Sequence, residues 1–187
     1  REIGKEMSRF NGYPSGTGYE TIGYTVNGDA VDWSYGDQEI VAFTPEVGSQ
    51  SQGFWPSEND VLPLCEEQLH ANKTFAFVAG PDLVIHEYEL TANVLNPGDQ
   101  IGIEISIQNR GLTDLSEEFQ VELSLINNMT AINDSFFIFS DLNARNTIDF
   151  STEFSINNDI QNGSEIGLIL TIFSESSFNR IDTISFM

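Results

Sequence analysis

The chain has 187 residues, of which 40% are hydrophobic, and this is enough to build the core of one large domain or two small ones. Its formal net charge of −22, from 29 acidic and 7 basic residues, argues against nucleic acid and anionic membranes as partners, because phosphate groups are bound by basic surfaces. The sequence has no run of 18 apolar residues and so predicts no membrane span, and its single cysteine excludes an intrachain disulfide.

The first part of the chain combines helical and strand patterns. The spacing of Ile3, Met7 and Phe10 places them on one face of a short helix. The Gly- and Pro-rich residues after it predict a loop as far as about Tyr35. The β-branched and aromatic run 38–44 predicts a buried strand.

Residues 57–77 predict a helix, and the N-cap candidates are at its start, in Ser57-Glu58-Asn59-Asp60. We expect Cys65 to pack inside this helix. The sequence Ala79-Gly80-Pro81-Asp82 ends this helix and predicts a domain boundary. We therefore expect one domain in residues 1–79 and a second in residues 82–187.

Beyond the boundary the hydrophobic period changes to two, which is the period of half-buried strands. Strands are predicted at 83–90, 101–107, 121–125, 135–139, 147–156, 165–173 and 181–186. This number of short strands predicts an all-β antiparallel sandwich of immunoglobulin-like architecture. We expect its phenylalanines to form the core, whereas an exposed row of aromatic side chains would favour ligand binding; they are Phe136, Phe137, Phe139, Phe150 and Phe154.

Glu46 is the first candidate for chemistry. It follows an apolar run, and a buried carboxylate needs a charged partner, a metal or a reaction to offset the cost of burial. An arginine could instead pair with Glu46, Tyr24 could cap a loop, and Trp33 is expected in a core.

Four spaced elements together resemble the C-terminal third of the zinc metallocarboxypeptidase family, of the carboxypeptidase A and T type. They are Tyr24, Asp32-Trp33-Ser34-Tyr35, Thr44-Pro45-Glu46 and Gly53-Phe54-Trp55-Pro56. The resemblance covers residues 1–78, and it implies that residues 1–79 are an α/β fragment, the C-terminal part of such a catalytic domain.

The resemblance also implies a role for each matching residue. Glu46 falls on the general base, which deprotonates zinc-bound water and passes the proton to the leaving amine. Tyr24 falls on a mobile tyrosine that closes over the bound C-terminus. Val31 falls on the floor of the pocket for the substrate's C-terminal side chain, and Thr44 lines the same pocket. The carboxylate of Asp29, near this pocket, could allow a basic C-terminal residue to bind there.

The family's zinc ligands, a His-x-x-Glu pair and a distant second histidine, are expected upstream of this region, so zinc belongs to the complete enzyme and its ligands are not in this chain. His86 and Glu89 spell His-x-x-Glu, but positions three apart in a regular strand point to opposite faces. His70 is expected to be a surface or packing residue, with Glu66 and Glu67 as its nearest acids.

These observations favour the C-terminal part of a secreted or cell-surface zinc metallocarboxypeptidase that hydrolyses the last peptide bond of peptides or proteins. Its partners are then peptide or protein C-termini and the missing upstream part of the catalytic domain. The isolated chain is expected to be inactive. The alternative is a non-catalytic protein whose β-sandwich binds a ligand or stabilises a neighbouring domain.

Overall fold

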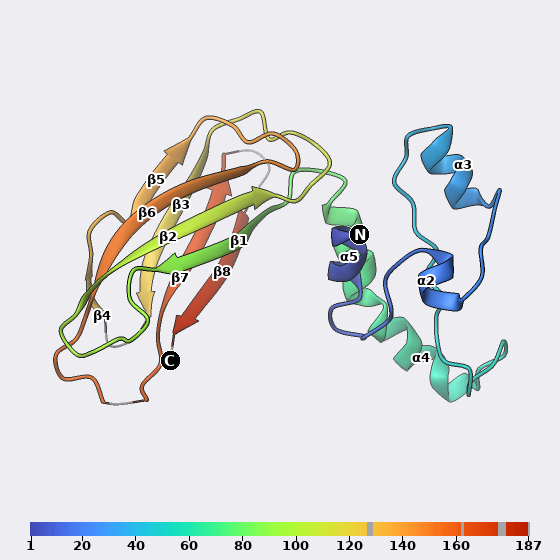
Figure 1. The fold of residues 1–187 in the computed structure, drawn as a ribbon, viewed down its shortest axis with the longest axis horizontal. Helices are drawn as coiled ribbons and strands as arrows, with labels where there is room; N and C mark the ends of the chain where they lie inside the picture. The colour runs from blue at the N-terminus through green and yellow to red at the C-terminus, as the bar shows by residue number, and fades with distance from the viewer. Residues whose placement is uncertain (127–128, 162, 176–178, 187) are drawn as a thin grey trace. The chain divides into compact units, whose positions relative to one another are not determined.

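The computed structural model describes residues 1–126, 129–161, 163–175 and 179–186. The chain divides into two compact units, Arg1–Ala76 and Phe77–Met187, and Figure 1 shows helices in the first and strands in the second. Within the described residues, no helix has the length and apolar character needed to cross a membrane.

Five short helices precede the first strand: α1 (Glu2–Met7), α2 (Gly18–Ile22), α3 (Ala30–Gly36), α4 (Glu58–Glu67) and α5 (Leu69–Phe77). Polar side chains begin three of them, because the first N–H groups of a helix have no partner within it. Thr17 and Glu20 form a capping box at α2, Asp29 caps α3, and Ser57 and Asp60 form a capping box at α4. Hydrogen bonds from Thr17 hold the pKa of Glu20 below its usual value.

The helices differ in part from the sequence-based expectations. The helix predicted from Ile3, Met7 and Phe10 is present as α1, although Phe10 itself is exposed. The loop predicted as far as Tyr35 is wrong, because capped helices α2 and α3 lie within it. The helix predicted for 57–77 is present but divided at Gln68 into α4 and α5.

The strand predicted for 38–44 is also wrong. Residues 39–47 have no regular secondary structure, and Ile40 is 56% exposed. A strand needs a neighbour to pair its N–H and C=O groups, and residues 1–76 contain no strand. Trp33 and Cys65, two side chains that were expected to be packed inside, are exposed. The first unit has few buried apolar residues against which they could pack.

Two antiparallel four-stranded sheets form the second unit, with strand orders β1-β2-β6-β4 and β5-β3-β7-β8. We call them the first and the second sheet (Figure 1). The strands are β1 (Leu83–Leu90), β2 (Gln100–Asn109), β3 (Phe119–Ile126), β4 (Met129–Ile132), β5 (Phe136–Phe139), β6 (Thr147–Ile156), β7 (Ile166–Ser174) and β8 (Asn179–Phe186). The seven predicted strands are all present, and β4 was not predicted.

The alternating residues predicted to face inward form one core shared by both sheets. Ile101, Ile103, Ile105 and Ile107 of β2 are at most 3% exposed and pack in one cluster with the inward residues of β7. Full burial of such side chains stabilises the fold by about 1.5–3 kcal/mol each. The two packed sheets make a β-sandwich.

The phenylalanines are mostly core residues, as expected. Phe150 and Phe154 are buried, and Phe137 and Phe139 are half-buried against the core cluster. Phe136 differs, because it is 49% exposed on the outer side of β5.

Asn109, at the end of β2, is fully buried and uses all of its amide hydrogen-bonding capacity. Its Nδ2 donates to the carbonyl oxygens of Thr113 and Leu142, at 2.9 and 3.0 Å. Its Oδ1 accepts from the backbone N–H groups of Asp82 and Gly111, both at 3.0 Å. One side chain thus joins the start of β1 to two loops.

Asp82 extends this network with ion pairs and is 3% exposed. Its Oδ2 accepts from Nε of Arg110 at 2.8 Å and forms an ion pair with Nη2 of the same residue at 2.7 Å, and its Oδ1 accepts from Nη1 of Arg180 at 3.3 Å. The backbone here is also tightly packed: a Cβ on Gly111 would lie 2.0 Å from the carbonyl oxygen of Gly80. The structure around Asp82, where the chain enters β1, is therefore held by specific polar contacts as well as by apolar burial.

Replacing Asn109 by Ala should destabilise the second unit by about 3 kcal/mol or more, because it leaves several buried backbone groups without partners. Urea unfolding followed by far-ultraviolet circular dichroism measures this change. Asn93→Ala is the matched control, since Asn93 is exposed, and it should change stability by less than about 0.5 kcal/mol. Equal effects of the two substitutions would contradict the role given to Asn109.

Candidate functional site

Glu46, the predicted base, lies exposed in the irregular segment 39–47. This segment is held within the first unit at three points. The Ile40 N–H donates to the Ser34 carbonyl at 2.9 Å, and Phe43 packs edge-to-face on Phe75 of α5 at a ring-centroid distance of 5.5 Å. Two residues after Glu46, Gly48 takes a left-handed conformation with φ of 91°.

Tyr13 provides the third point of attachment. Its hydroxyl accepts a hydrogen bond from the Gly48 N–H at 2.7 Å and donates one to Glu67 at the end of α4. Burial and the bond to Glu67 raise the pKa of Tyr13 above its ordinary value. Sequence reasoning gave Tyr13 no role, because a tyrosine in a Gly- and Pro-rich loop carries no pattern that indicates its partners.

The predicted substrate-binding residues lie before this segment. Asp29 is half-buried at the N-cap of α3, where its carboxylate accepts the Asp32 N–H at 2.8 Å. Val31 is half-buried in the first turn of the same helix. Tyr24 is 61% exposed in the segment between α2 and α3, and Thr44 is exposed two residues before Glu46.

These five residues are not joined into a network in this structure. Across the described part of the chain, no hydrogen bond or ion pair connects Glu46 with Tyr24, Asp29 or Thr44. The carboxylate of Asp29 is engaged locally instead, because it caps its own helix by accepting from the Asp32 N–H.

The first unit leaves much of its apolar surface uncovered. Its buried hydrophobic residues are Ile3, Met7 and Ala71. Its large exposed ones include Tyr19, Tyr35, Phe54, Trp55 and Leu62, with Phe54 and Trp55 more than 90% exposed. Contiguous apolar surface of this kind is typical of sites that contact another chain segment or a partner.

The residues present do not fit a zinc site. Of the two histidines, His70 lies in the first unit and His86 in the second. Among the described residues, no group of three or more His, Cys, Asp and Glu side chains is arranged to hold a metal ion. His86 and Glu89 are both exposed on β1, whose pairing is irregular between Ile85 and Glu87.

His70 is a packing residue, but its acidic neighbour is not the predicted one. Its Nε2 lies 2.9 Å from the carbonyl oxygen of Glu6 and 3.7 Å from the carboxylate of the same residue. Its ring packs edge-to-face on Phe10 at 4.5 Å. The partner comes from α1 rather than from Glu66 or Glu67, a tertiary contact that helix spacing cannot indicate.

Comparison with known proteins bears on the first unit. The sequence model of the zinc carboxypeptidase family matches residues 2–71. This match supports a zinc carboxypeptidase-related origin for that part of the chain, and it includes all five predicted site residues and Tyr13. No curated protein matches the chain.

Two solved structures resemble the chain weakly. A FixG-related protein from Vibrio parahaemolyticus is 7% identical, covers 54% of this chain and 94% of its own, and gives a TM-score of 0.34. β-Glucosidase 3B from Thermotoga neapolitana, solved in complex with glucose, is 15% identical, covers 56% of this chain and 16% of its own, and gives a TM-score of 0.28. Likenesses at these TM-scores carry no information about the function of this chain.

The bonds of Tyr13 predict a pH-dependent contribution to stability. Because the folded state raises the pKa of Tyr13, its contribution is complete below the unfolded value of about 10 and is lost as the pH rises through the folded value. Tyr13→Phe should lower the stability of the first unit by about 1 kcal/mol at neutral pH. It should also remove the tyrosine that ionises late in an ultraviolet titration.

Tyr19→Phe is the matched control, because Tyr19 is 71% exposed. It should leave both the stability and the high-pH end of the titration unchanged. A late-ionising tyrosine that persists in Tyr13→Phe would contradict the assignment.

Proposed function

We propose that this chain is the C-terminal part of a secreted zinc metallocarboxypeptidase, which removes the last residue of peptides or proteins. The observation that carries the proposal is the match of residues 2–71 to the zinc carboxypeptidase family. The four spaced elements around Tyr24, Trp33, Glu46 and Trp55 lie inside this match. Secretion and the immunoglobulin-like type of the sandwich are part of the proposal.

In the proposed reaction, Glu46 is the general base. Its carboxylate accepts a proton from the attacking water and then gives it to the nitrogen of the departing amino acid. Its exposure in this structure leaves the carboxylate accessible to water and substrate. The attachment of Gly48 to Tyr13 restrains the backbone two residues away.

The other candidates have substrate-binding roles. Tyr24 closes over the C-terminal residue of the substrate, and its position in an exposed segment after the left-handed Gly23 suits a residue that moves. Val31 and Thr44 line the pocket for the C-terminal side chain. The carboxylate of Asp29 is engaged as a helix cap, which favours apolar over basic C-terminal residues.

The complete enzyme needs a second segment. We propose that the remainder of the catalytic domain covers the exposed apolar residues of the first unit and supplies the ligands of the zinc ion, whose chemistry is to polarise the scissile carbonyl and acidify water. Burial of Phe54 and Trp55 alone would contribute about 1.5–3 kcal/mol per side chain to such an association.

An assay of the isolated chain tests whether the zinc ligands lie outside these 187 residues. The purified 187 residues, supplied with zinc and a peptide, should release no C-terminal amino acid above the rate of a blank. Amino-acid analysis over several hours measures the release. Clear turnover would contradict the proposal, because it would require a zinc site within these residues.

A longer protein that includes the zinc-binding segment tests Glu46 itself. Glu46→Gln should lower kcat about 10²–10⁴-fold, since the amide cannot accept the proton. Glu39→Gln is the matched control, because Glu39 is exposed seven positions earlier, and it should retain activity within about twofold. Equal activity of the two variants would remove Glu46 from the reaction.

A further inference from the structure

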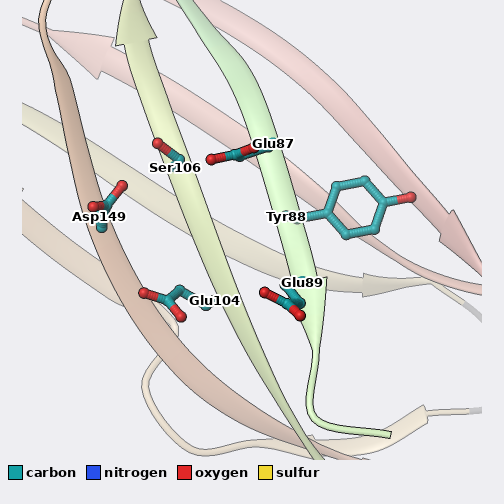
Figure 2. Close-up of a pocket in the computed structure, with 6 residues that line it drawn as sticks. All are labelled: Glu87, Tyr88, Glu89, Glu104, Ser106 and Asp149. Atoms are coloured by element: carbon teal, nitrogen blue, oxygen red, sulfur yellow. The ribbon is translucent and has the colours of Figure 1, made fainter. Parts of the chain in front are cut away.

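An acidic depression lies on the outer side of the first sheet (Figure 2). Three neighbouring strands line it: β1 gives Glu87, Tyr88 and Glu89, β2 gives Glu104 and Ser106, and β6 gives Asp149. The buried residues of β2 alternate with Glu104, which places this carboxylate on the face opposite the core. In Figure 2 the Tyr88 ring extends from β1 away from the carboxylates.

Strand register brings like charges together in the depression. Glu87 pairs with Ser106, which pairs in turn with Asp149, and Glu89 pairs directly with Glu104. Like charges directly opposite each other on neighbouring strands are destabilising. No basic side chain lines the depression, so nothing in its lining offsets this repulsion.

Besides His86 on β1, the basic residues of the second unit are few. Residues 81–187 contain three arginines and no lysine. Arg110 and Arg180 pair with Asp82, and Arg145 donates to the Arg110 carbonyl. Across the described residues, the carboxylates of Glu87, Glu89, Glu104 and Asp149 make no hydrogen bond or ion pair.

Ser106 gives a second and independent indication of a ligand. It is 8% exposed and lines the depression between Glu87 and Asp149 (Figure 2). Its hydroxyl has no hydrogen-bond partner among the described residues. Polar groups of buried residues are normally hydrogen-bonded, so the Ser106 hydroxyl, which lines the depression, indicates a partner from outside the chain.

We propose that this depression binds a basic segment of another protein, an extended peptide with Lys or Arg at alternate positions. Ammonium and guanidinium groups donate several hydrogen bonds each and can span separated carboxylates. Glu87 and Glu89 lie two residues apart on β1, which is also the same-face spacing of an extended peptide. A single metal ion fits poorly, because no described group of three ligands converges on one point.

This site lies in the second unit, and it does not rest on the proposed peptidase activity. It gives the sandwich a binding role of its own, with a ligand class set by charge. Its affinity should fall as salt rises, since exposed charge pairs are screened.

A charge-matched pair of variants of the full 187-residue chain tests the site. The probe is a fluorescent, N-acetylated peptide in which four arginines alternate with serines, followed by fluorescence anisotropy at low salt. The triple variant E87Q/E89Q/E104Q should bind about tenfold more weakly, because three charge pairs are lost. The control variant E118Q/D134N/D159N removes three exposed acids elsewhere and should bind within about twofold of wild type.

Ser106→Ala tests the depression without a change of charge. It should weaken peptide binding about threefold, the effect of one hydrogen bond. Circular dichroism checks that each variant is folded. Glu104→Gln should raise the Tm slightly, because it removes the repulsion with Glu89, so weaker binding by this variant cannot be a result of unfolding.

Three outcomes would overturn the proposal. The first is equal weakening by the two triple variants, which would mean that only net charge attracts the peptide. The second is displacement of the peptide by spermidine or calcium at equal charge concentration, which would make the site one for small cations. The third is unchanged binding in both Ser106→Ala and the E87Q/E89Q/E104Q variant.

Discussion

Apolar side chains in water must be covered by other apolar surface, and the two units of this chain meet this requirement to different degrees. In the sandwich, the inward residues of β2 and β7 cover each other across the space between the sheets, and several are entirely buried. In the first unit, buried apolar residues are few and the aromatic residues Phe54 and Trp55 are open to water. The sandwich therefore covers its own apolar side chains, whereas the first unit leaves large ones exposed.

The polar interactions follow the same division. In the second unit, the cost of burying Asn109 and Asp82 is offset by complete hydrogen bonding and by two arginines. In the first unit, polar contacts such as that of Tyr13 with Gly48 fix a loop in the absence of a sheet. The segment that carries the candidate base Glu46 is therefore held by contacts within the first unit.

The sequence predicted the sandwich well because its signal is local. The alternation of Ile101, Ile103 and Ile105 depends only on which face of a strand is buried. Strand 38–44 was predicted wrongly on the same kind of signal, because an apolar run specifies a strand only where a partner strand exists. Tyr13 and the acidic depression could not be predicted, since they depend on which distant residues the fold brings together, such as the pairing of Glu89 with Glu104.

The exposed position of Cys65 on α4 has a consequence for the covalent state of the protein. Each chain carries one thiol, and it is accessible to solvent. A disulfide between two copies of these 187 residues would use the thiol of each, and the resulting dimer would have no thiol left to react. Disulfide cross-linking among copies of these 187 residues therefore cannot extend beyond pairs.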